Sequence, residues 1–203
     1  MSSYDNFISD FPLRCSDLLK MFQDKAESAN LGVTLLLSIA STALLIPYAR
    51  LKETNHPSSD FQHFCSAASE LDNKMKGYFS RSVFTNASGG HWGLGNVTIT
   101  DGCCPENINT LCRPISAKKQ TGTVIKIIRN ALAHGNILTR GNPIKRIFFL
   151  SKPFKEAIRY DCLSVTIEDF RFFLDEWFEF LSSLNLPNDI SDGVDFFSDD
   201  RVA

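Results

Sequence analysis

Apolar residues recur every three or four positions along most of the chain, which is the spacing of helices with one buried face. This spacing predicts a first helix that begins near Asp10 and Pro12 and ends at residues 30–32. A second, almost wholly apolar helix follows from Leu31 to Tyr48. The pattern Ser59-x-x-Gln62 resembles a capping box and predicts a third helix, which extends to about Phe79.

The second half of the chain returns to helical spacing at a fourth helix, expected from about Thr121 to His134, with Gly135 as its left-handed stop residue. Two short runs, Ile147–Ser151 and Ala157–Val165, predict the strands of a small hairpin. Thr166 is placed to cap the last helix, whose apolar and aromatic face continues to Leu184.

Between about residues 80 and 120 the periodicity dissolves into a glycine-rich stretch, although residues 97–100 (V-T-I-T) are compatible with a short strand. We interpret this stretch as a long Gly-rich insertion. The predicted fold class is therefore all-α: an antiparallel bundle of about five helices with a small β-hairpin and this insertion. Residues 1–185 are expected to form a single domain, and residues 186–203 an acidic C-terminal tail.

The composition is that of an ordinary globular protein of 203 residues, with 43% hydrophobic and 22% charged side chains. Seventeen phenylalanines predict an aromatic-rich core. The apolar run from Leu31 to Tyr48 is shorter than the roughly 20 residues that a bilayer requires. It also contains hydroxyl side chains and Pro47, so we expect a helix buried on all sides and no membrane partner.

The first residues (MSSYDNFISDF) have neither a basic start nor a long apolar run, so no signal peptide is expected and the protein is predicted to be cytoplasmic. Its six cysteines are then expected to be reduced thiols rather than disulfides. His91, Cys103, Cys104 and Cys112 do not have the spacing of a recognised zinc site, and we expect no metal and no cofactor.

Charge is distributed unevenly. The segment from Arg113 to Arg159 contains eleven Lys or Arg and a single acid, Glu156, whereas Glu168 to Asp200 contains ten acids and one base. A one-sided basic segment indicates an anionic partner for that face of the protein.

The basic segment contains I127-I-R-N-A-L-A-H134-G135, in which Arg129, Asn130 and His134 interrupt an apolar helix near its end. Histidine titrates near neutral pH and arginine offers a planar donor fork for phosphate. On a helix, Asn130 and His134 are separated by only about 40°, but Arg129 and His134 by roughly 140°. The alternative reading is structural: His134 caps the helix end and Arg129 lies over apolar surface.

The R129-N-A-L-A-H134 motif, together with a preceding buried helix that ends in L45-I-P-Y-A-R50 and the T166-I-E-D-F-R helix start, resembles the HEPN superfamily (higher eukaryotes and prokaryotes nucleotide-binding). The similarity is to an uncharacterised, plasmid-type bacterial branch. It implies an all-α bundle and a metal-independent endoribonuclease of toxin or antiviral-defence type. It also implies a homodimer, in which two motifs meet in one cleft, and catalytic roles for Arg129, Asn130 and His134.

RNA is therefore the expected partner. Lys126, Arg140, Lys145 and Arg146 lie close to the motif in sequence and are predicted to contact its phosphates, the alternative for each being a solvated surface charge. Two other functions stay open: a non-catalytic RNA- or nucleotide-binding HEPN module, and a toxin–antitoxin interaction module that binds an antitoxin protein through the aromatic face of Phe170–Leu184.

Overall fold

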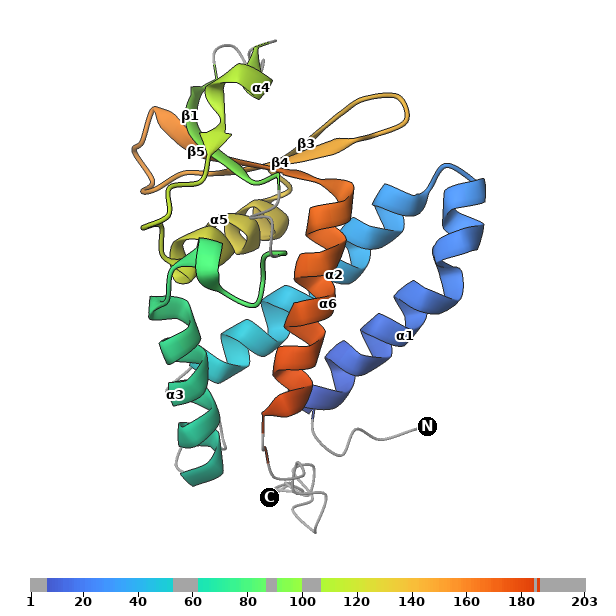
Figure 1. The fold of residues 1–203 in the computed structure, drawn as a ribbon, viewed down its shortest axis with the longest axis vertical. Coiled ribbons are helices and arrows are strands. Elements are labelled where there is room, and N and C mark those ends of the chain that lie inside the picture. Colours follow the sequence, from blue (N-terminus) through green and yellow to red (C-terminus); the bar gives the residue numbers. More distant parts are fainter. Residues whose placement is uncertain (1–6, 53–61, 87–90, 100–106, 185, 187–203) are drawn as a thin grey trace, which may run out of the picture.

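The computed structural model describes residues 7–52, 62–86, 91–99, 107–184 and 186 (Figure 1). Its helices are α1 (Phe7–Ser28), α2 (Gly32–Lys52), α3 (Gln62–Lys76), α4 (Ile108–Leu111), α5 (Thr121–His134) and α6 (Ile167–Ser183), with a 3-10 turn at Phe79–Arg81. Its strands are β1 (Gly93–Thr98), β2 (Arg113–Pro114), β3 (Ile137–Arg140), β4 (Arg146–Ser151) and β5 (Arg159–Thr166).

The prediction of an all-α fold is wrong. In the described part of the chain the strands form one antiparallel sheet in the order β2-β1-β5-β4-β3, so the fold is mixed α/β. The expected hairpin is present as β4 and β5, which are paired from Arg146↔Thr166 to Ser151↔Asp161. Three further strands extend the sheet beyond this hairpin. Strands β1 and β2 come from the segment that we interpreted as a Gly-rich insertion, and β3 directly follows α5.

The sheet lies across one end of the helical layer (Figure 1). Helix α5 packs against β4 and β5 on the face toward the other helices, while α4 contacts β1. Alternation along β4 separates the two faces: Ile147 and Phe149 belong to the main hydrophobic core, whereas Phe148 and Leu150 belong to a second, smaller cluster. The main core draws its buried side chains from residues as far apart in the chain as Ile8 and Leu184.

The five long helices agree with the predicted ones, with shifted ends. Helix α1 begins at Phe7, contains Pro12 and ends at Ser28, two residues before Asn30, which adopts a left-handed φ of 59°. Thr166 caps α6 as predicted, because its side chain accepts a hydrogen bond from the Asp169 N–H. The residues proposed to precede α3 as a capping box, 59–61, lie outside the described residues.

Helix α2 is not buried on all sides. Thr34, Ser38 and Thr42 form an exposed stripe along it, and the hydroxyls of Ser38 and Thr42 donate to carbonyls of the same helix. The rest of α2 contacts α1, α3, α5 and α6. By length and composition, Gly32–Leu51 is the one helix of the described chain that is long and apolar enough to cross a membrane.

Candidate functional site

Helix α5 ends in a glycine turn that fixes the position of His134. Gly135 has a φ of 66°, and the N–H of Asn136 donates to the Ala131 carbonyl at 2.9 Å. A left-handed backbone conformation at this position favours glycine, and the sequence predicted Gly135 as the stop residue. His134 is thereby held in the last turn with an exposed side chain. The apolar side of α5 is buried, at Val124, Ile125, Ile127, Ile128, Ala131 and Leu132.

Asn130 connects the motif to the sheet. Its amide oxygen accepts hydrogen bonds from Arg129, from Nη2 at 2.9 Å and from Nε at 3.3 Å. Its amide nitrogen donates to Ser151 Oγ, the last residue of β4, at 3.1 Å. An amide supplies both a donor and acceptors, so an asparagine satisfies both neighbours at once.

Arg129 contacts Tyr48 and its neighbour Asn130. Its guanidinium carbon lies 5.4 Å from the centre of the Tyr48 ring on α2, a cation–π contact, while two of its N–H groups point at Asn130. Arg129 is therefore hydrogen-bonded to Asn130, which lies one turn before His134 on the same helix.

Asn130 and His134 line a common pocket of about 510 Å³ between the end of α5 and the β4–β5 turn. This volume is within the range of small-ligand sites. Its lining residues are Asn130, His134, Asn136, Ser151, Lys152, Phe154, Lys155 and Tyr160.

The pocket is suited to an anion that carries an aromatic base. Its lining contains two lysines and no carboxylate, and Lys152 Nζ lies 5.4 Å from the centre of the Tyr160 ring. Phe154 is 64% exposed, which leaves its ring available for stacking. An imidazole, two amides and two ammonium groups thus line a space that is open to a phosphate.

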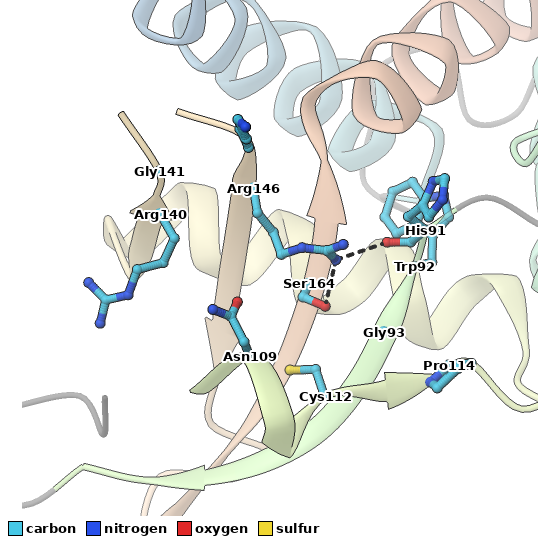
Figure 2. Close-up of a pocket in the computed structure, with 11 residues that line it drawn as sticks. His91, Trp92, Gly93, Asn109, Cys112, Pro114, Arg140, Gly141, Arg146 and Ser164 are labelled. Atoms are coloured by element: carbon cyan, nitrogen blue, oxygen red, sulfur yellow. Dashed lines mark hydrogen bonds between the residues drawn. The ribbon is translucent and has the colours of Figure 1, made fainter. Parts of the chain in front are cut away.

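The predicted RNA-binding residues do not lie in this pocket. Arg140, Lys145 and Arg146 line a second pocket of about 540 Å³ at the opposite end of β4, roughly 17 Å away by strand rise (Figure 2). Lys126 is exposed on α5 and lines neither pocket. Residues that are close to the motif in sequence are therefore not the residues that surround it in space.

In the second pocket, Arg146 donates to the His91 carbonyl at 3.2 Å and to Ser164 Oγ at 3.5 Å (Figure 2). Arg140 is the direct cross-strand neighbour of Arg146. These two guanidiniums, with Lys145, make this end of the sheet basic, as the charge distribution indicated.

Ser151, Lys152 and Lys155 were not singled out by sequence reasoning. A signal for Ser151 existed, because it shares the helix-facing side of β4 with Ile147 and Phe149 once the strand's phase is known. Lys152 and Lys155 were visible only as members of the basic segment, since their position depends on the β4–β5 turn.

Two of the weighed zinc candidates, Cys103 and Cys104, lie outside the described residues. Among the residues that the structure does describe, no group of three or more His, Cys, Asp or Glu is placed to hold a metal ion. Cys112 instead lies beside Cys162, and His91 contacts Asp169.

A family model described as HEPN pEK499 p136 matches residues 1–188. The chain belongs to this HEPN family. The resemblance inferred from the motif is thus confirmed, including its assignment to a plasmid-type branch. No curated protein and no solved structure matches the chain significantly. HEPN domains are commonly ribonucleases, and the match spans both the motif and the strands that complete the pocket.

The aromatic face of α6 is part of this HEPN domain's own core. Phe170, Phe173, Trp177 and Phe180 are buried, and Trp177 Nε1 donates to the Ala43 carbonyl on α2 at 3.0 Å. A partner could reach this face only by opening the core, so the described structure counts against its use as a docking surface.

Proposed function

We propose that this HEPN protein is an endoribonuclease that cleaves RNA without a metal ion, at a composite site formed by two copies of the chain, as in toxin or antiviral-defence systems. The observation that supports it most directly is the pocket that joins His134 to Asn130, Ser151 and two lysines. Family membership adds that HEPN domains are commonly ribonucleases.

The proposed reaction is attack by the ribose 2′-oxygen on the adjacent phosphorus. His134 takes the 2′-hydroxyl proton, the new P–O bond forms, and the 5′-oxygen leaves with a proton from a second imidazole. Lys152 and Lys155 stabilise the charge that develops on the phosphate oxygens. The products are a 2′,3′-cyclic phosphate and a free 5′-hydroxyl.

Arg129 has a positioning role within its own chain in this proposal. By donating twice to Asn130 it fixes the amide that donates to Ser151 beside His134. Its remaining N–H donors have no hydrogen-bond partner among the described residues, which leaves them for a phosphate held between two subunits.

A second subunit is proposed because the reaction needs a base and an acid at the same time. One chain places a single histidine in the pocket, so a symmetric dimer in which the partner's His134 faces the same phosphate supplies both groups.

The decisive experiment is cleavage of single-stranded RNA in EDTA with mapping of the product ends. The wild type should yield 2′,3′-cyclic phosphates, and His134→Ala should lose this activity by at least about a hundredfold. Because His134 is exposed, the His134→Ala protein should have the same circular dichroism spectrum and melting temperature as the wild type. Equal cleavage by the wild type and His134→Ala would refute the assignment.

The alternative is a non-catalytic HEPN module that holds RNA or a nucleotide in the same pocket. The engagement of Arg129 by Tyr48 and Asn130 favours it, since the arginine does not line the pocket. RNA binding by the wild type that persists in His134→Ala, with no cyclic-phosphate product from either protein, would support this alternative.

A further inference from the structure

Two thiols from distant parts of the chain meet on the outer face of the sheet. Cys112 Sγ lies 3.3 Å from Cys162 Sγ, although the two residues are 50 positions apart. Cys162 is a fully buried residue of β5, and Cys112 is the partly exposed residue between α4 and β2. No disulfide joins the cysteines that the structure describes, so both are thiols here.

The approach of Cys112 to the sheet depends on two glycines of β1. A Cβ added at Gly93 would lie 2.6 Å from Ser164 Oγ and 3.2 Å from Cys112 Cβ. A Cβ added at Gly95 would overlap the Leu111 carbonyl and lie 3.2 Å from Cys112 Cα. Both glycines are on β1, which is paired with β5, so they provide the room in which Cys112 lies against Cys162.

Cys112 is the accessible member of the pair. It lines the second pocket together with Arg146 and Ser164 (Figure 2). Cys162 does not line this pocket and is fully buried. The pKa of Cys112 is lowered, first by its hydrogen bond with Cys162, then by a hydrogen bond with Ser164 and the charge of Arg146; its partial burial opposes this shift. A partly exposed thiol in electropositive surroundings has the features of a reactive cysteine.

We propose that Cys112 is a peroxide-reactive thiol and that Cys162 resolves its oxidised form into a disulfide within the chain. The juxtaposition of a partly exposed sulfur and a buried sulfur, in contact at the edge of a basic pocket, is the arrangement of a sensor cysteine with its resolving partner. This modification site is independent of the ribonuclease proposal.

The chemistry requires a hydroperoxide as oxidant. The Cys112 thiolate attacks one peroxide oxygen, so that an S–O bond forms, the O–O bond breaks, and the leaving oxygen takes up a proton as water or an alcohol. Cys162 Sγ, as the thiolate, then attacks Cys112 Sγ; the S–S bond forms and hydroxide leaves as water after taking up the Cys162 proton. Two thiols are oxidised by two electrons in total and one hydroperoxide is reduced.

The test uses the full chain with Cys103→Ser and Cys104→Ser, because the tryptic peptide that contains Cys112 otherwise contains three cysteines. The reduced protein is exposed to hydrogen peroxide, alkylated and digested without reductant. Cross-linked Cys112 and Cys162 peptides should appear, while Cys15 and Cys65 should be recovered alkylated. After the same oxidation, the protein should still migrate as a single chain on a denaturing, non-reducing gel, because the disulfide forms within the chain.

Four variants separate the steps. Cys162→Ser should accumulate a dimedone-reactive sulfenic acid on Cys112, Cys112→Ser should leave Cys162 alkylatable, and the matched control Cys65→Ser should behave as the parent. Arg146→Gln should slow the loss of the Cys112 thiol several-fold. The proposal is overturned if Cys162 of the parent stays fully alkylatable after Cys112 has been oxidised, or if Cys112 reacts no faster than the more exposed Cys65.

Discussion

The Asn130 side chain donates a hydrogen bond to Ser151 Oγ at 3.1 Å, which ties the motif helix α5 to the end of strand β4. Through this bond the motif is attached to the predicted β4–β5 hairpin, which is part of a larger sheet that the all-α expectation did not contain. Both residues of this bond line the pocket together with His134, so the proposed catalytic site includes the end of the β4–β5 hairpin.

Replacement of Asn130 by aspartate tests this bridge. Asn130→Asp keeps an acceptor for Arg129 but removes the donor to Ser151, and it places a negative charge in the pocket. We expect RNA cleavage to fall by about tenfold or more, since a tenfold rate loss corresponds to roughly one hydrogen bond. Asn136→Asp is the matched control, because it adds the same charge to the pocket lining and leaves the bridge intact. An equal loss in both variants would attribute the effect to charge alone.

The two lysines of the pocket should determine the salt dependence of RNA binding. In a His134→Ala background, which prevents cleavage, Lys152→Ala or Lys155→Ala should each reduce the slope of log K against log salt by about 0.7. Lys126→Ala, which removes an exposed cation outside both pockets, is expected to change the slope little. Fluorescence polarisation with labelled single-stranded RNA at four salt concentrations measures this slope for each variant. Equal effects of all three substitutions would indicate a diffuse electrostatic contact.

The glycine after His134 should stabilise the helix end through its backbone conformation alone. A Cβ at Gly135 would meet no atom within 4 Å, but φ is 66°. Gly135→Ala is therefore expected to lower the free energy of unfolding by about 1–2 kcal/mol, and Gly135→Asn by less. Urea denaturation of the two variants measures both values. A Gly135→Ala protein as stable as the wild type would show that this end of α5 rearranges.

Asp169 should make the protein sensitive to acid. It is 4% exposed; burial disfavours its ionisation, but hydrogen bonds from the His91 N–H, the Thr166 hydroxyl and the His91 ring outweigh burial and lower the pKa of Asp169. This pKa is below that of an aspartate in the unfolded chain, about 3.9. The contribution of Asp169 to the free energy of unfolding is therefore complete above the unfolded-state pKa and is lost as the pH falls below about 4. Asp169→Asn should be less stable at pH 7 by about 1–3 kcal/mol.

The same variant should lose less stability between pH 5 and pH 2.5 than the wild type does, measured by urea denaturation at each pH. Glu168→Gln, which alters the exposed neighbour of Asp169 on α6, is the control and should follow the wild-type curve. Parallel curves for the wild type and Asp169→Asn would show that Asp169 does not contribute to the acid response.

The helices could be predicted because each one has its own periodicity. The buried positions of α5, its stop at Gly135 and the Thr166 cap of α6 all follow from residues a few positions apart. Strand β1 has only a partial local signal, at Val97 and Thr98. Its sequence is G-L-G-N-V-T, and it is a strand because Gly93 to Thr98 are paired with Ser164 to Arg159 of β5, a contact between distant segments.

The candidate site was predictable to the same extent. Asn130 and His134 are one helical turn apart, so their common pocket follows from the sequence. The contribution of Ser151 depends on the packing of β4 against α5, and the placement of Arg140 and Arg146 at the other end of the sheet depends on the β3–β4 register. Charges that are neighbours in sequence were separated by strands that local patterns do not specify.

The composite site makes a quantitative prediction for mixed dimers. If cleavage requires His134 from both subunits, a dimer that contains one His134→Ala chain is inactive. Co-refolding equal amounts of wild type and His134→Ala then leaves about a quarter of the wild-type activity per total dimer, because random pairing forms that fraction of wild-type homodimers. Independent sites would instead leave about half. The matched mixture with Lys126→Ala should keep nearly full activity, which controls for losses during refolding. Sedimentation at the assay concentration must show dimers, and an active monomer would contradict the composite site directly.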